Sequence, residues 1–93
     1  MDVYKETIFE FHAGQMSVGT TPAVLPHQRA YKGVRVKADA SNTGVIYVGP
    51  STVSASTGYP LAKGEEVLIA VEDPALVSVV ADAGGQKIAW LSV

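Results

Sequence analysis

The sequence predicts an all-β protein, an antiparallel β-sandwich in a single domain that spans residues 1–93. Fourteen Val, four Ile and six Thr make about a quarter of the chain β-branched, and such side chains favour strands over helices. Short apolar or alternating runs recur roughly every ten residues between Gly, Pro, Asn and Asp, which is typical of sandwiches. A chain of 93 residues is long enough for one small domain and too short for two.

Nine runs have the composition of strands, and they lie at residues 3–11, 16–18, 23–25, 31–38, 45–49, 52–55, 65–71, 77–82 and 87–93. The first run carries charges on both faces, so residues 1–15 form either an N-terminal arm that reaches another subunit or an edge strand of the sandwich. One helical turn is predicted at residues 72–76, because Asp73 can cap it and Pro74 fits its first position.

Two connections have the composition of tight hairpin turns. Asn42 and Gly44 lie between the runs 31–38 and 45–49, and both residues tolerate a positive φ angle. Gly84 and Gly85 lie between the last two runs and match a two-residue hairpin loop. We therefore expect two β-hairpins, with a positive φ at one or more of these glycines.

Two further glycines, Gly58 and Gly64, bound a predicted loop. Leu61 lies between them and is expected to pin this loop to the core. Turn formation without a ligand is the interpretation that we prefer for all the glycines of the connecting segments.

The alternation of side chains predicts which strand faces need cover. In residues 31–38 the apolar side chains share one face, whereas Arg35 and Lys37 share the other, as in an outer strand. The runs 65–71 and 87–93 are apolar on both faces, and a two-layer sandwich covers only one of them. We therefore expect a homo-oligomer. The candidate interface residues are Tyr4, Phe9, Phe11, Leu68, Trp90 and Leu91.

The composition excludes several classes of partner. Charged residues make up 17% of the chain, against about 25% in typical soluble domains. The net charge is -2 and the seven Lys and Arg residues are scattered, which argues against nucleic acid as a partner. No apolar run approaches the ~18 residues of a membrane span, and the first residues have no apolar signal region. We expect a soluble protein without membrane attachment.

No set of residues in the sequence predicts catalysis, a metal site or a cofactor. His12 and His27 have no second ligand at metal-binding spacing, and both are expected in surface loops. The adjacent Glu65 and Glu66 would point to opposite faces of a strand and so cannot act as a pair. There is no cysteine to act as nucleophile or to form a disulfide. We therefore expect a protein that is not an enzyme and binds no cofactor.

Aromatic side chains leave one ligand class open. The aromatic residues that are able to stack on sugar rings are Tyr4, Tyr31, Tyr47, Tyr59 and Trp90. Packing in the core or against another subunit is the interpretation that we prefer, because Trp90 shares a strand face with Ile88. A glycan is therefore the less favoured partner.

Two segments resemble a pattern found in small virion proteins of tailed bacteriophages: VRVKADASNTGVIYVG at residues 34–49 and TGYPLAKGE at residues 57–65. The flanking VGTTPAVLP (18–26) and AGGQKIAWLSV (83–93) fit the same pattern, so the likeness covers roughly residues 16–93. Proteins of this type are β-sandwiches or jelly-roll-like domains, and several decorate or cement the capsid as trimers.

The resemblance implies a jelly-roll-like fold, a trimer and a role in the virion. The expected protein is made in the cytoplasm of the bacterial host and then binds the lattice of the major capsid protein at the capsid surface. The alternative is a carbohydrate-binding module on the virion surface or tail. The two differ in whether Tyr47, Tyr59 and Trp90 line an exposed groove or are buried.

Overall fold

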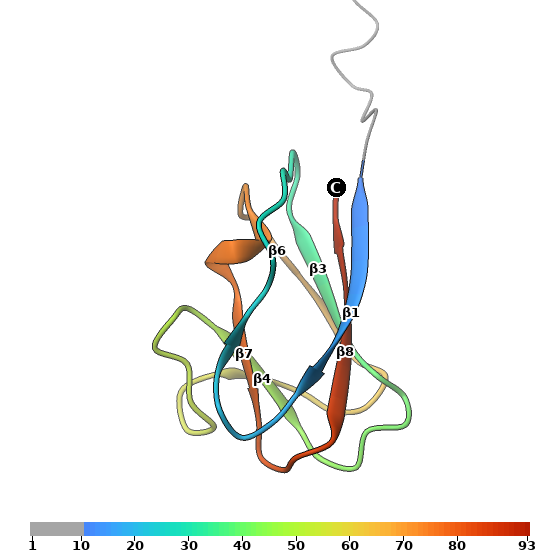
Figure 1. The fold of residues 1–93 in the computed structure, drawn as a ribbon, viewed down its shortest axis with the longest axis vertical. Helices are drawn as coiled ribbons and strands as arrows, with labels where there is room; N and C mark the ends of the chain where they lie inside the picture. The colour runs from blue at the N-terminus through green and yellow to red at the C-terminus, as the bar shows by residue number, and fades with distance from the viewer. Residues whose placement is uncertain (1–10) are drawn as a thin grey trace, which may run out of the picture.

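Eight β-strands and one 3₁₀ turn, η2, form the fold in the computed structural model, which describes residues 11–93 (Figure 1). The strands are β1 (His12–Val18), β2 (Ala23–Val24), β3 (Val34–Ala38), β4 (Ile46–Gly49), β5 (Tyr59–Leu61), β6 (Glu66–Ile69), β7 (Ser78–Ala81) and β8 (Gln86–Ser92), and η2 is Pro74–Leu76. Sheet A has the order β1-β8-β3-β6 and sheet B the order β2-β7-β4-β5. The predicted all-β antiparallel sandwich is confirmed. None of the helical turns in residues 11–93 is long and apolar enough to cross a membrane.

The strand pairing is that of one long hairpin rolled up on itself. β1 pairs with β8, β2 with β7, β3 with β6 and β4 with β5, all antiparallel, so the first half of the chain runs back along the second half. Pairing of β3 with β8 and of β4 with β7 then completes the two sheets. An eight-stranded double sheet of this kind is a jelly roll, as the sequence resemblance implies.

The prediction of two β-hairpins is wrong. In this fold almost every connection runs from a strand of one sheet to a strand of the other. β3 lies in sheet A and β4 in sheet B, so Asn42 and Gly44 belong to a crossing between sheets. Gly84 and Gly85 lie in the crossing from β7 to β8. The expected positive φ is confirmed at Gly85, where φ is 73°, but Gly44 and Gly84 have none.

Most predicted strands agree with the structure, and two regions differ. The predicted strand at residues 52–55 is wrong, because this stretch forms turns closed by hydrogen bonds such as that from the Val53 N–H to the Pro50 carbonyl, 2.9 Å. β5 is not among the predicted strands, since Pro60 lies at its centre and removes one hydrogen-bond donor. Of the first predicted strand, residues 3–10 lie outside the described residues. The capped turn at Asp73 and Pro74 is confirmed.

β3 begins at Val34, three residues later than the sequence predicts. The N–H groups of Tyr31, Lys32 and Gly33 all donate to the Val93 carbonyl oxygen, at 2.8, 2.6 and 3.1 Å. Three consecutive donors can converge on one acceptor only where the backbone turns, and Gly33 has a φ of 150° there. The segment 31–33 is therefore a turn that is tied to the end of β8.

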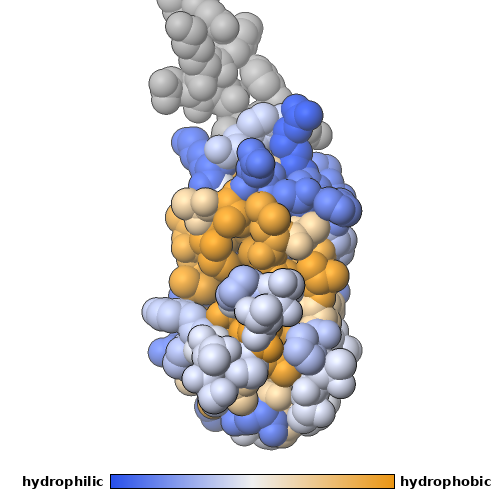
Figure 2. All heavy atoms as spheres, turned by 90° about the vertical axis from the view of Figure 1, so that its left-hand side faces the viewer, coloured by the Kyte–Doolittle hydropathy of each residue, from blue (hydrophilic) through white to orange (hydrophobic). Residues whose placement is uncertain are grey.

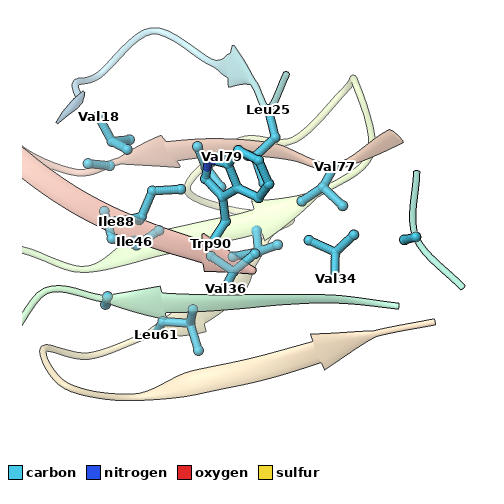
Figure 3. Packing of buried hydrophobic residues seen from close by; sticks show 14 residues of the cluster. Val18, Leu25, Val34, Val36, Ile46, Leu61, Val77, Val79, Ile88 and Trp90 are labelled. Atoms are coloured by element: carbon cyan, nitrogen blue, oxygen red, sulfur yellow. The ribbon is translucent and has the colours of Figure 1, made fainter. Parts of the chain in front are cut away.

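The core lies between the two sheets and is made of the alternate side chains of each strand. In β3 the predicted alternation is confirmed, with Val34, Val36 and Ala38 buried and the two basic residues exposed. Figure 3 shows the indole of Trp90 directed into the space between the sheets, near Leu25 and Val79. Trp90 is only 7% exposed and belongs to this core.

The outer side of sheet B is covered by the loop of residues 50–58. Val53 in this loop is buried, and so is Val80, which faces away from the main core on β7. The close approach requires glycine at position 58, because a Cβ atom there would lie 2.6 Å from the Cβ of Tyr47 and 2.8 Å from a methyl group of Val53. All four residues of β7 are therefore buried.

Candidate functional site

An apolar groove opens between the two sheets where their edge strands β5 and β6 lie. We call it the edge groove, and it is lined by Val48, Gly49, Pro50, Tyr59, Val67, Ile69, Val71, Leu76 and Val77. Its volume is about 310 Å³. Val67 and Ile69 pack against the core but stay half-buried, because no other strand within residues 11–93 lies beyond β6 in sheet A. The groove thus continues the hydrophobic core out to the surface.

The rim of the edge groove carries two large exposed side chains. Tyr59 of β5 is 60% exposed and Leu76 at the end of η2 is 57% exposed. Figure 2 shows the side of the molecule on which Figure 1 draws η2 and the loop 50–58, and hydrophobic surface gathers there in one broad patch. Exposed apolar patches on soluble proteins mark surfaces that bind other molecules.

The main chain beside the groove is open to an added strand. The Ala38 N–H donates to the Glu65 carbonyl at 2.9 Å, which fixes the alternation of hydrogen-bonded pairs between β3 and β6. In that alternation Val67 and Ile69 bond to β3, whereas the N–H and C=O groups of Glu66 and Leu68 point to the free edge. β5, across the groove, contains Pro60 and so offers one donor fewer to a partner strand.

The outer face of sheet A is mixed rather than apolar. Register places Arg35 between Leu68 and Leu91, and Arg35 Nη1 lies 3.4 Å from Glu66 Oε2. Lys37 lies on the same face, two residues further along β3, beside Ala89 of β8. The second face of β6 and β8, which the sequence alone shows as apolar, is therefore interrupted by the basic side chains of β3.

The predicted interface residues are spread over the molecule. Tyr4 and Phe9 lie outside the described residues. Phe11, 63% exposed, directly precedes β1 at one edge of sheet A, and Leu68 is exposed on β6 at the other edge. Leu91 is half-buried on β8 between them. Of the predicted interface residues that the structure describes, only Leu68 adjoins the edge groove, on the opposite face of the same strand.

The predicted turn residues all lie outside strands; they are Asn42, Gly44, Gly58, Gly64, Gly84 and Gly85. Gly64 and Gly85 have left-handed backbone, with φ of 81° and 73°. Asn42 is buried, and its side-chain amide binds main chain rather than a ligand.

The three aromatic residues that define the glycan alternative do not share a groove. Tyr47 is half-buried on the outer side of sheet B beneath the 50–58 loop, whereas Tyr59 faces the edge groove. Trp90 belongs to sheet A and is buried in the core. The three rings therefore do not form one exposed surface on which a sugar could stack.

A polar cluster at the end of the sandwich joins the 25–30 segment to η2. Asp73 Oδ1 accepts hydrogen bonds from the N–H groups of Ala75 and Gln28, at 2.9 and 3.2 Å, and Oδ2 lies 2.7 Å from His27 Nδ1. The Ala75 N–H and the His27 ring hold the pKa of the Asp73 carboxyl below its usual value. The hollow beside the cluster is wide, about 660 Å³, but this carboxylate is already satisfied by groups of the chain itself.

In the part of the chain that the structure describes, neither histidine belongs to a group of metal ligands. His12 lies in β1, contrary to the expected loop, and His27 lies in a loop as predicted. Within residues 11–93, no three His, Asp or Glu side chains lie close enough together to hold a metal ion.

Sequence reasoning alone misses the edge groove as a site. The alternation identifies Val67, Ile69 and Val71 as one apolar face, but their exposure follows from the place of β6 at the sheet edge. The one local signal is Pro60 beside Tyr59, since proline inside a strand is typical of sheet edges. No local signal marks the pairing of His27 with Asp73, which are 46 residues apart.

No protein-family model matches this chain, and no curated protein or solved structure shows a significant match. The edge groove and the free edge of β6 are therefore the features on which a function can be proposed.

Proposed function

We propose that the chain is a structural virion protein of a tailed bacteriophage, which decorates or cements the capsid as a homo-oligomer, with a trimer favoured. It acts through protein contacts, without catalysis or a cofactor, at the capsid surface. The edge groove carries the proposal, because an exposed apolar groove beside an unpaired strand edge is suited to another protein chain. The phage origin and the trimer rest on the sequence resemblance over residues 16–93.

The physical rationale is avidity. A lattice presents many equal sites, so an oligomer that touches several subunits at once gains affinity without any single strong contact. A protein that binds the assembled shell but not its separate subunits also stabilises the shell by mass action. The low share of charged residues in the chain, 17%, suits extended contact with other proteins.

The first test is the mass in solution together with binding to the shell. Light scattering of the full chain should give a multiple of 9.7 kDa, and a trimer gives three times that mass. The protein should also co-sediment in a saturable way with capsids of the parent phage that lack it. A monomer that stays monomeric at micromolar concentration and does not sediment with the shell would contradict the proposal.

Matched variants connect the result to the groove. Leu76→Ser and Tyr59→Ser change the rim of the edge groove, whereas Val24→Ser and Tyr31→Ser change similarly exposed large side chains outside it. The rim variants should weaken assembly or shell binding about tenfold, as expected for anchors of an interface. The variants outside the groove should behave like the wild type. Equal effects in both pairs would remove the groove from the proposal.

A further inference from the structure

We propose that the edge groove receives the N-terminal segment of a second copy of this chain. Residues 3–9 of that copy add a strand to the free edge of β6, and Phe9 is the anchor in the groove. This inference rests on the oligomer of the proposed function and specifies its contact.

The acceptor edge has both main-chain partners and side-chain room. Glu66 and Leu68 direct two N–H and two C=O groups away from β3, which matches the hydrogen-bonding needs of one added strand. Because side chains alternate along a strand, every second residue of the guest points into the edge groove and the others lie beside Leu68. Val67 and Ile69 supply the apolar floor of the groove.

The N-terminal segment carries a large apolar side chain on each of its two faces. Val3, Lys5, Thr7 and Phe9 share one face, and Tyr4, Glu6 and Ile8 share the other. The first face brings an aromatic ring to a groove of about 310 Å³, which is large enough for a Phe side chain. The second face brings Tyr4 and Ile8, with Glu6 between them, to the exposed Leu68. The seven residues are also a usual strand length.

The stretch between Phe9 and β1 is too short for Phe9 to reach the edge groove of its own molecule, so the segment must come from a second copy. The register places His12 and Ile69 in one row, at the two opposite edges of sheet A. Strands lie about 4.8 Å apart, so a strand added beyond β6 is about 19 Å from β1. Phe9 precedes His12 by three residues, which span at most about 11 Å when fully extended. Phe9 therefore cannot reach this position in its own molecule.

The resulting contact joins two different surfaces, the start of β1 on one copy and the free edge of β6 on the next. Such a head-to-tail contact closes into a ring when its rotation divides a full turn. A ring of three copies buries three N-terminal segments in three edge grooves and leaves no groove empty. The contact thus agrees with the trimer of the proposed function.

Disulfide trapping tests the contact directly, because the chain contains no cysteine of its own. The full chain with Phe9→Cys and Leu76→Cys is oxidised and compared with the chain with Phe9→Cys and Ala40→Cys. Ala40 is exposed in the crossing from β3 to β4, and no residue of that crossing lines the edge groove. Both sites are exposed, so neither substitution should prevent folding.

We expect covalent oligomers from the Leu76 pair and at least tenfold less from the Ala40 pair. Mass spectrometry should then find the residue 9 peptide joined to the residue 76 peptide of another chain. A disulfide within one chain would overturn the inference, and so would equal cross-linking of the two pairs or none. Light scattering of the unmodified protein separates the failures: an oligomer without the Leu76 cross-link refutes only this contact, whereas a monomer refutes the proposed function.

A second measurement keeps the inference testable without cysteine. Phe9→Ser should raise the dissociation constant of the oligomer about tenfold, and Leu76→Ser should do the same. The double variant should be no weaker than either single one, because both remove the same contact. Losses that multiply in the double variant would show that the two residues act at separate places and would overturn the inference.

Discussion

The side-chain amide of Asn42 forms two hydrogen bonds with the main chain of Lys87, in the way that the main chains of two paired strand residues bond to each other. Asn42 Nδ2 donates to the Lys87 carbonyl at 2.9 Å, and Asn42 Oδ1 accepts from the Lys87 N–H at 2.8 Å. Gln86 extends the contact, since its Oε1 accepts from the N–H groups of Thr43 and Gly44 at 2.8 and 2.9 Å. Two buried amides thus fasten the β3–β4 crossing to the start of β8.

Asn42→Ala should therefore destabilise the fold. The substitution leaves the Lys87 N–H without its partner in a partly buried place, which costs about 1–3 kcal/mol in the free energy of unfolding. Urea denaturation at one fixed protein concentration measures the change, because the stability of an oligomer depends on concentration. Ala40→Ser, at an exposed position in the same crossing, serves as control and should change little. A stable Asn42→Ala variant would mean that the crossing is held by other contacts.

Local sequence signals predict the elements and miss how they connect. The cap at Asp73 and the alternation of β3 depend on neighbours within a few residues, so they can be recognised from the sequence. Whether the strands on either side of Gly44 stay in one sheet depends on pairing with β7 and β8, some forty residues away. Turn chemistry is the same in both cases, and it therefore favours hairpins where the chain crosses between sheets.

The same limit applies to the candidate site. The apolar face of Val67 and Ile69 is predictable from their alternation along the chain. Their exposure follows from the edge position of β6, and the groove needs Leu76 and Tyr59 from distant parts of the chain. A burial pattern along one strand does not tell a core strand from an edge strand.

Gly44→Ala should destabilise the fold by steric overlap and not through its φ angle. A Cβ atom at position 44 would overlap the Asp82 carboxylate, which accepts a hydrogen bond from the Val45 N–H at 3.0 Å. We expect a loss of about 1–3 kcal/mol. In the background of Asp82→Ala the same substitution should cost less, because the overlapping group is gone. Gly19→Ala is the control, since a Cβ atom at position 19 would have no neighbouring atom within 4 Å.

Gly84 and Gly85 form a matched pair for backbone conformation. Neither has a neighbouring atom within 4 Å of where a Cβ would lie, but only Gly85 has left-handed backbone, with φ of 73°. Gly85→Ala should cost about 1–2 kcal/mol, whereas Gly84→Ala should change the stability by less than about 0.5 kcal/mol. Thermal or urea unfolding of the two variants measures the difference. Equal costs would show that the turn adopts another conformation in solution.

Ser92→Ala should stabilise the protein. The Ser92 hydroxyl is fully buried on the inner side of β8 and has no hydrogen-bond partner among residues 11–93. A buried hydroxyl without a partner loses its hydrogen bonds to water and forms none in the protein. Its removal should therefore raise the free energy of unfolding by about 1 kcal/mol. Ser78→Ala, at another buried serine, lacks this particular defect and should not stabilise. Destabilisation by Ser92→Ala would indicate that the hydroxyl finds a partner in solution.

Asp73 should make the stability depend on acid pH. Hydrogen bonds from the Ala75 N–H and the His27 ring favour the charged carboxylate and lower its pKa in the folded state. A carboxyl with a lowered pKa stabilises the fold fully above its ordinary pKa of about 3.9 and loses that contribution as the pH falls through the lowered value. The Asp73→Asn variant lacks the titrating group, so its urea midpoint should fall less than that of the wild type between about pH 5 and strongly acid pH. His27→Ala removes one of the two main causes and keeps the Ala75 bond, so its acid dependence should lie between the two. If Asp73→Asn loses stability with acid as steeply as the wild type, other carboxyls and not this cap govern the acid response.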